Sequence, residues 1–226
     1  MSLILNIDTA TEIASISIAK DGITEMEILN TEQKDHGGFL QPAIQTLLSN
    51  THIDIHEIDA IAISAGPGSY TGLRVGMASA KGLAYALNKP LITLCTLEIL
   101  AYAAVESHIE ILSDSCLFCP MIDARRMEVF TALYDNKLQT ILKPCALILA
   151  ENSFANTLLK KQVLFFGNGA KKWSLICHHK NAVFIGPVNN ALAMSKLAYQ
   201  KFGQNNFASI AYTEPFYLKE FFNGAS

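Results

Sequence analysis

A glycine-rich loop lies between a predicted buried strand and a predicted helix. It reads Ala65-Gly66-Pro67-Gly68-Ser69-Tyr70. Glycine permits a positive φ and lets another backbone or a ligand approach closely. A loop of this kind at a helix N-terminus also binds anions, because the free N–H groups and the helix dipole favour negative charge. The loop predicts either a phosphate cradle or a tight turn, and Gly-x-Gly alone does not separate the two.

Two aspartates end apolar strands at corresponding places in the chain. Asp8 opens the run Asp8-Thr9-Ala10-Thr11, and Asp123 opens Asp123-Ala124-Arg125. Each carboxylate could cap its own hairpin turn, or hold a metal ion through water if a nucleotide binds there. A kinase that uses two such aspartates needs Asp-x-Gly at the second one, so that the backbone can approach phosphate. Arg125 stands in the place of that glycine. The bulky Arg125 therefore indicates a degraded site.

Other patterns that could carry chemistry are weaker. The pair Cys116 and Cys119 lacks a second pair and borders a strand, which favours structural thiols. His178 and His179 are adjacent and would point in different directions. Arg125 and Arg126 could bind phosphate or RNA, although two arginines at a hairpin are more often a solvated surface or an ion pair. The spacing supports no Ser/His/Asp or Cys/His nucleophile.

The elements that must position these residues follow one order twice. Apolar runs with strand and helix spacing give the order β-β-β-α-β-α-β-α over residues 1–105, and again over residues 106–226. A polar passage at residues 106–115 separates the two predicted domains. The second one carries the C-terminal helix and tail. Helices are predicted at residues 39–48, 71–87, 97–105, 151–161, 171–177 and 189–202, with Thr71 as one N-cap. The class is α/β.

A duplicated unit whose copies each open with a strand ending in Asp points to the actin-like ATPase or sugar-kinase architecture. The chain also closely resembles the TsaB (YeaZ) family. The matching runs are Ile4–Thr11, Gly66–Gly76, Ala80–Ala84, Asp123–Arg126 with Glu128–Phe130, and Pro215–Lys219. The architecture implies a vestigial nucleotide or phosphate site, formed by Asp8, Thr9, Thr11, Gly66, Gly68, Ser69 and Asp123.

The resemblance implies a partner protein in bacterial tRNA modification. The family binds the catalytic paralogue TsaD and, with the ATPase TsaE, supports threonylcarbamoyl transfer to an adenosine of the tRNA anticodon loop. TsaD holds its metal with two histidines four residues apart. Thr96 and Leu100 stand at the corresponding positions here, and leucine has no lone pair to offer a metal. We therefore expect no metal, no cofactor and no catalysis by this chain alone, and contact with tRNA only through the complex.

Two predicted helices carry too little charge for ordinary surface helices. Residues 71–87 contain only Arg74 and Lys81 as charges, and residues 39–48 contain none. Small residues that recur every four positions would let a partner helix approach closely. We expect these helices to share an outer face that binds TsaD, or a second copy of the chain when TsaD is absent. The predicted contacts are Leu40, Ala43, Ile44, Leu47, Leu73, Gly76, Met77, Ala80, Leu83 and Ala84.

Composition limits the remaining possibilities. The net charge of −3 and the absence of a basic block argue against a large nucleic-acid surface. No apolar run is long enough to cross a membrane, no signal peptide is visible, and five cysteines in mostly apolar segments suit a reduced cytoplasm. The predicted function is a non-catalytic scaffold or activator subunit in tRNA threonylcarbamoyladenosine biosynthesis. The main alternative is a small-molecule kinase or nucleotide hydrolase, and a metallopeptidase is a third.

Overall fold

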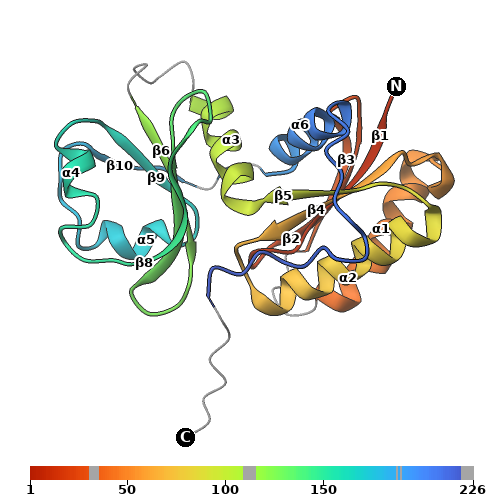
Figure 1. Ribbon diagram of the computed structural model, residues 1–226, viewed down its shortest axis with the longest axis horizontal. Helices are drawn as coiled ribbons and strands as arrows, with labels where there is room; N and C mark the ends of the chain where they lie inside the picture. The colour runs from red at the N-terminus through yellow and green to blue at the C-terminus, as the bar shows by residue number, and fades with distance from the viewer. Residues whose placement is uncertain (31–35, 109–115, 187, 189, 220–226) are drawn as a thin grey trace, which may run out of the picture.

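The computed structural model describes residues 1–30, 36–108, 116–186, 188 and 190–219. The chain forms two lobes, each built on one five-stranded sheet (Figure 1). The first sheet has the order β3-β2-β1-β4-β5, in which β1 pairs with β2 antiparallel and with β4 parallel. Its strands are β1 (Leu3–Asp8), β2 (Ala14–Lys20), β3 (Ile23–Asn30), β4 (Ala60–Gly66) and β5 (Leu91–Cys95).

The second sheet repeats this arrangement. Its order is β10-β9-β6-β7-β8, with β6 antiparallel to β7 and parallel to β9. The strands are β6 (Leu117–Asp123), β7 (Glu128–Tyr134), β8 (Thr140–Ile148), β9 (Val163–Phe166) and β10 (Ala182–Phe184). The first strand of each half therefore lies at the centre of its sheet and ends in an aspartate. The predicted α/β class and duplicated actin-like architecture are confirmed.

The helices differ in length between the two halves. The long ones are α1 (His36–Thr51), α2 (Tyr70–Leu87), α3 (Thr96–His108) and α6 (Asn190–Gly203), and a short 3₁₀ helix spans Ile55–Glu57. The helices predicted at residues 151–161 and 171–177 are wrong in length, because only α4 (Ala155–Leu158) and α5 (Ala170–Ser174) form. Phe154 has a φ of 59°, and its ring packs on Phe165 and Trp173. This aromatic packing takes the place of a longer helix in the second lobe.

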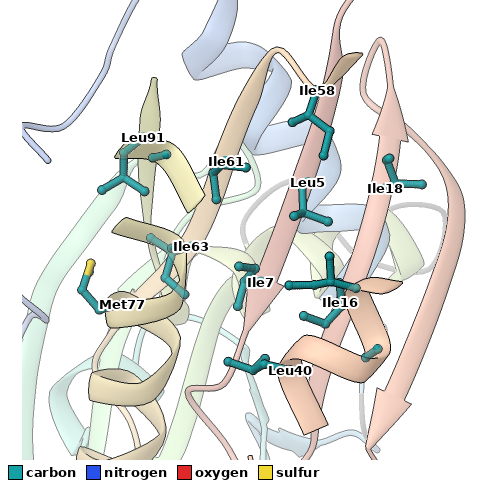
Figure 2. Close-up of a cluster of buried hydrophobic side chains, with 14 of the residues drawn as sticks. Leu5, Ile7, Ile16, Ile18, Leu40, Ile58, Ile61, Ile63, Met77 and Leu91 are labelled. Atoms are coloured by element: carbon teal, nitrogen blue, oxygen red, sulfur yellow. The ribbon is translucent and has the colours of Figure 1, made fainter. Parts of the chain in front are cut away.

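The first sheet is covered on both faces. Helices α1 and α2 pack on one face against a cluster of branched side chains that includes Leu5, Ile7 and Ile63 (Figure 2). Helix α6 packs on the other face, where Met194 and Leu197 meet Ile4. Because water reaches neither face, β4 is buried along its whole length. No helix in the described parts of the chain is both long and apolar enough to cross a membrane.

The last helix of each half packs across the domain boundary. Helix α3 belongs to the first half, yet Leu97, Leu100 and Ala104 pack with Phe118 and Phe166 of the second sheet. Helix α6 belongs to the second half but covers the first sheet. The strands before residue 106 form the first sheet, and those after it form the second. The C-terminal helix, however, packs with the first domain rather than with the second.

After α6 the chain returns across the first lobe. We call residues 204–219 the strap. The strap is fixed to the first sheet by hydrogen bonds from Ala208 N to Leu91 O at 2.8 Å and from Phe216 N to Ala65 O at 2.6 Å. Its end reaches the second lobe, where Lys219 forms an ion pair with Glu128. The strap therefore adds a further contact between the two lobes.

Two glycines of α2 provide a stability test. A Cβ at Gly76 would collide with Thr9 Oγ1 and meet Ile63, whereas a Cβ at Gly82 would have nothing within 4 Å. We expect Gly82→Ala to raise the free energy of unfolding by about 0.5–1 kcal/mol, since alanine favours helix. Gly76→Ala should lower it by about 1–3 kcal/mol through overpacking. Urea unfolding of the two variants measures both changes, and equal effects would contradict the packing described here.

Candidate functional site

The glycine-rich loop is in contact with protein backbone on both sides. Gly66 has a φ of +118°, and a Cβ there would lie 2.6 Å from the carbonyl oxygen of Phe216. A Cβ at Gly68 would collide with the carbonyl oxygen of Ala10. The two glycines therefore allow the loop to lie directly against the strap and the first hairpin. Of the two predicted alternatives, this geometry fits the tight turn, and the turn also packs closely against the two neighbouring segments.

Three N–H groups of the loop and of the first turn of α2 have acceptors within the protein. Ser69 N donates to Ala10 O at 2.7 Å, and Leu73 N donates to Ser69 O at 2.8 Å. Gly72 N donates to Ser69 Oγ at 3.3 Å, so the N-cap of α2 is Ser69 and the prediction of Thr71 is wrong. Thr9 Oγ1 donates to Gly72 O at 2.8 Å. Thr9 and Ser69 thus hold the helix start in place.

Asp8 lies at the end of β1 and is 3% exposed. Its Oδ1 accepts hydrogen bonds from Ser64 Oγ at 2.6 Å and from Ala10 N at 3.0 Å. Burial raises the pKa of the Asp8 carboxyl group above its ordinary value, although the bonds to Ser64 and Ala10 act in the opposite direction. The folded protein therefore holds the carboxylate in a position where ionisation is disfavoured.

Asp8 lines a cavity of about 660 Å³ that lies between residues of both lobes. Thr11, Glu12 and Glu27 line it from the first lobe, together with apolar side chains, and Lys171 and Asn168 line it from the second. Burial raises the pKa of Glu27, and the negative charge of Asp8 adds to this effect. The first-lobe end of the cavity is acidic, which opposes the binding of phosphate there.

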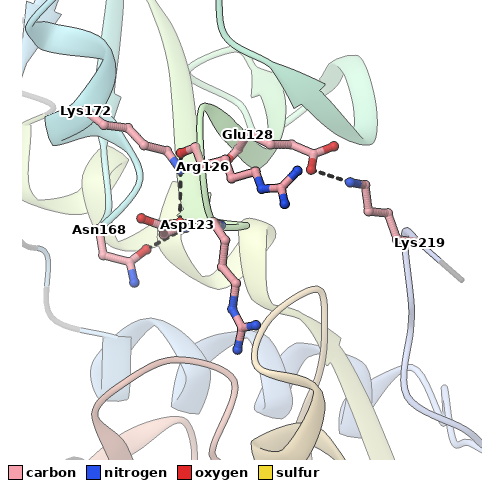
Figure 3. Close-up of polar contacts among 7 residues, drawn as sticks. Asp123, Arg126, Glu128, Asn168, Lys172 and Lys219 are labelled. Atoms are coloured by element: carbon pink, nitrogen blue, oxygen red, sulfur yellow. Dashed lines mark hydrogen bonds and ion pairs between the residues drawn. The ribbon is translucent and has the colours of Figure 1, made fainter. Parts of the chain in front are cut away.

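Asp123 lies in different surroundings from Asp8. Its Oδ1 accepts hydrogen bonds from Lys172 Nζ at 2.9 Å and from Arg125 N at 2.5 Å. Asn168 Oδ1 accepts a hydrogen bond from Asp123 N at 2.9 Å. Figure 3 shows Lys172 directed at this carboxylate. Asp123 does not line the cavity that contains Asp8, so the structure does not bring the two aspartates together as one open carboxylate pair.

Of the five remaining residues of the predicted nucleotide site, only two line a cavity. Thr11 lines the cavity with Asp8, and Gly68 lines a second cavity of about 460 Å³ beside Arg125 and Arg126. Gly66, Thr9 and Ser69 line neither of them. The absence of a nucleotide cofactor from the chain alone stays a prediction.

The predicted metal positions lie at the start of α3. Thr96 is 0% exposed and Leu100 is 6% exposed. The Oγ1 of Thr96 is buried without a hydrogen-bond partner, and Leu100 packs in the core that α3 shares with the second sheet. A buried methyl-bearing side chain and a leucine do not fit the pair of imidazoles that this metal requires.

The structure corrects the set of residues predicted for the partner face. Nine of the ten are buried, and Leu83 alone is partly exposed. They point inward because α1 and α2 use their most apolar stripes to cover the first sheet. The buried residues are Leu40, Ala43, Ile44, Leu47, Leu73, Gly76, Met77, Ala80 and Ala84.

A different stripe of α2 faces outward. Ala78, Gly82 and Ala86 are exposed at a spacing of four residues, and Tyr85 beside them is 80% exposed. We call these four residues, with the exposed Gln41 and Gln45 of α1, the outer helix face. It contains small and uncharged side chains, as the prediction required, but on the opposite side of the helix.

Sequence reasoning missed the partners of the Asp123 loop. Lys172 lies 49 residues from Asp123, and no local pattern connects the two. In the sequence, Phe216 and Tyr217 belong to a run that resembles the TsaB (YeaZ) family, and no other pattern marks them. Their place beside Arg125 and Arg126 in the second cavity follows from the path of the strap.

Asp8 gives a pH-dependent prediction. In the unfolded chain its carboxyl group titrates near about 3.9, and in the folded chain its pKa is raised. Ionisation therefore opposes folding as the pH rises above the unfolded value. We expect Asp8→Asn, which keeps an oxygen acceptor, to raise the melting temperature at pH 7 and to lose this advantage as the pH approaches 4. Thermal unfolding at several pH values measures this, and a lower melting temperature for the variant at pH 7 would contradict it.

Comparisons with known proteins agree with this architecture. Residues 27–219 match the family model described as TsaD, tRNA N6-adenosine threonylcarbamoyltransferase. Two solved structures from Pseudomonas aeruginosa share the fold. One, called YeaZ, has a TM-score of 0.77 at 24% identity and covers 96% of this chain and 100% of its own. The other, described as similar to peptidase YEAZ, has a TM-score of 0.81 at 23% identity, with 97% and 100% covered. At these identities the structures establish the fold alone.

Curated relatives extend the comparison to sequence. The "tRNA threonylcarbamoyladenosine biosynthesis protein TsaB" of Bacillus subtilis (strain 168) is 32% identical over 170 residues, which cover 73% of this chain and 70% of the relative. The protein of the same name from Escherichia coli (strain K12) is 28% identical over 228 residues, covering 96% and 94%. The chain therefore belongs to the TsaB (YeaZ) family of tRNA threonylcarbamoyladenosine biosynthesis proteins, within the wider family that the TsaD model describes.

Proposed function

We propose that this chain is a non-catalytic subunit in the biosynthesis of threonylcarbamoyladenosine in tRNA. In this role it binds and activates a TsaD-type catalytic paralogue, and a TsaE-type ATPase joins the complex. The transfer reaction and its metal belong to the paralogue. The chain acts in the cytoplasm, where its five free cysteines would remain reduced.

The observation that carries this proposal is the chemistry of Thr96 and Leu100. A metal-dependent paralogue needs nitrogen donors at both positions, and this chain offers a buried hydroxyl and a buried hydrocarbon. Supplying histidines there would place two imidazoles in the core between α3 and the second sheet. The same two side chains oppose the metallopeptidase alternative as well.

The kinase or hydrolase alternative is opposed by the two aspartate sites. Asp123 is engaged by Lys172 and by the backbone of Arg125, so it is not free to hold a nucleotide-bound metal. The N–H groups of Ser69, Gly72 and Leu73 are used inside the protein. We therefore propose no nucleotide or metal cofactor for the chain alone.

The outer helix face is the proposed contact for the paralogue. Helices α1 and α2 lie on the same side of the first sheet, so their outward sides form one surface. None of the six residues of this face is charged, although the exposed Arg74 lies one turn before Ala78 on the same stripe. Ala78, Gly82 and Ala86 would let a partner helix approach the backbone of α2. A second copy of the chain could use the same surface in isolation. The paralogue should then compete with the homodimer, because one face cannot bind both.

Substitution on this face tests the proposal. We expect Gly82→Arg and Ala78→Arg to abolish co-elution with a TsaD-type partner and to prevent threonylcarbamoyl transfer in the reconstituted system. An unpaired charge buried in a helix contact is costly. Size-exclusion chromatography measures binding, and circular dichroism checks folding. Ala155→Arg, at an exposed position of α4, serves as the control. Normal binding by both α2 variants would refute the assignment of this face.

The metal assignment can be tested on the same proteins. We expect elemental analysis of the purified chain to find far less than one transition metal per molecule, and a chelator to leave its melting temperature unchanged. In the complex, bound metal should depend on the partner's histidines. One tightly held metal per chain, lost on substitution of a side chain in this protein, would contradict the proposed division of labour.

A further inference from the structure

The cavity of about 460 Å³ beside Arg125 and Arg126 has no role in the function proposed above. We call it the Arg–Tyr cavity. It lies where the start of α2, the loop after β6 and the strap meet. The residues that define it here are Tyr70, Arg125, Arg126, Phe216, Tyr217 and Lys219. Its volume is in the range of pockets that hold small organic ligands or a single nucleotide.

The cavity carries an excess of positive charge. Arg125 and Arg126 are both exposed, and no ion pair recorded for the described residues uses either guanidinium. Lys219 is neutralised by Glu128 (Figure 3). Each guanidinium is a planar group of donors that suits phosphate oxygens, and both arginines line the same cavity. In a chain of net charge −3, this local excess is a distinct feature.

The loop that carries the arginines is held firmly. Lys172 Nζ donates to Asp123 Oδ1 at 2.9 Å, to Arg126 O at 2.8 Å and to Glu128 O at 2.5 Å. Arg125 and Arg126 have φ values of 68° and 50°. A positive φ is unfavourable for a residue with a long side chain and persists only where surrounding contacts impose it. Lys172 supplies such contacts, so the fold fixes the backbone from which both arginine side chains extend.

Aromatic rings form the other side of the cavity. The rings of Tyr70 and Tyr217 lie 5.2 Å apart between centroids, and the Arg74 guanidinium lies over the Tyr70 ring at 5.3 Å. Phe216 and Tyr217 remain 43% and 39% exposed. Large exposed rings next to cationic side chains are the usual means by which proteins bind unpaired nucleotides, since every base has a face that can stack.

We propose that the Arg–Tyr cavity binds one unpaired nucleotide of RNA. Its base stacks on the aromatic side chains of the strap, and its phosphate lies between Arg125 and Arg126. This inference rests on the proposed function, which brings an RNA to the complex. It goes further, because it gives this chain a direct RNA contact. An acidic peptide would use the arginines but leave the rings unused, and a free nucleotide shares the chemistry but comes from a different source.

The cavity is also well placed for a shared substrate. Tyr70 opens α2, whose outward side forms the outer helix face. A partner on that face would therefore lie beside the cavity, and an RNA held by the partner could reach it. The contact with one nucleotide adds to the affinity of the complex for RNA and does not supply it alone. This agrees with the absence of a basic block from the sequence.

The test uses a fluorescein-labelled RNA hairpin with an unpaired loop, titrated with the full chain and with its complex by fluorescence anisotropy. We expect the double variant Arg125→Ala with Arg126→Ala, and separately Tyr217→Ala, to weaken binding by at least about fivefold. Tyr217→Phe keeps the ring and should bind as the unchanged protein does. Lys137→Ala with Lys143→Ala removes the same charge at exposed positions outside the cavity and serves as the control.

Each outcome decides the proposal. Unchanged binding by the arginine and Tyr217 variants, or an equal loss in the lysine control, would overturn it. Competition by micromolar ATP would assign the cavity to a free nucleotide instead. Co-elution with the TsaD-type partner is measured on the same variants, and loss of both RNA and partner would make the cavity a protein contact. Failure of the unchanged chain to bind the partner would instead refute the proposed function, whatever the RNA result.

Discussion

The structure depends on close backbone contact at the glycine-rich loop. Three segments distant in sequence meet there: the first hairpin at Ala10, the loop at Gly66 and Gly68, and the strap at Phe216. No residue with a Cβ could allow these approaches at Gly66 or Gly68. The loop therefore fixes the start of α2 and one side of the Arg–Tyr cavity together. A motif that resembles a phosphate cradle serves here to join parts of the protein to each other.

Much of this fold could be predicted from the sequence because its strands are short apolar runs ended by turn residues. The repeated strand order also placed Asp8 and Asp123 at corresponding points. The outward side of α2 could not be predicted in the same way. Gly76, Ala80 and Ala84 form one stripe of small residues, and Ala78, Gly82 and Ala86 form another. The first stripe faces the sheet, where Gly76 lies against Thr9 and Ile63 and Met77 and Ala80 join the core.

The candidate site was less predictable because its surroundings depend on residues far apart in the chain. Asp8 and Asp123 are equivalent in topology, but one is buried next to Ser64 and the other is exposed beside Lys172. Local spacing carries no sign of Lys172. The short helices α4 and α5 are likewise accompanied by the packing of Phe154 on Trp173, which no helical period reveals. Long-range contacts thus determine the site, whereas local patterns determine the elements.

The exchange of the last helices between the lobes has a consequence for synthesis on the ribosome. The strands of the first sheet are all complete once residue 95 has been made, but one face lacks α6 until residue 203 has emerged. During that interval Ile4, Ala62 and Ile92 would lack their contacts with Met194 and Leu197 of α6. The second sheet packs with α3, which is already made, so it is the first sheet whose packing must wait for the end of the chain. The sheet that is made first therefore depends for its packing on the helix that is made last.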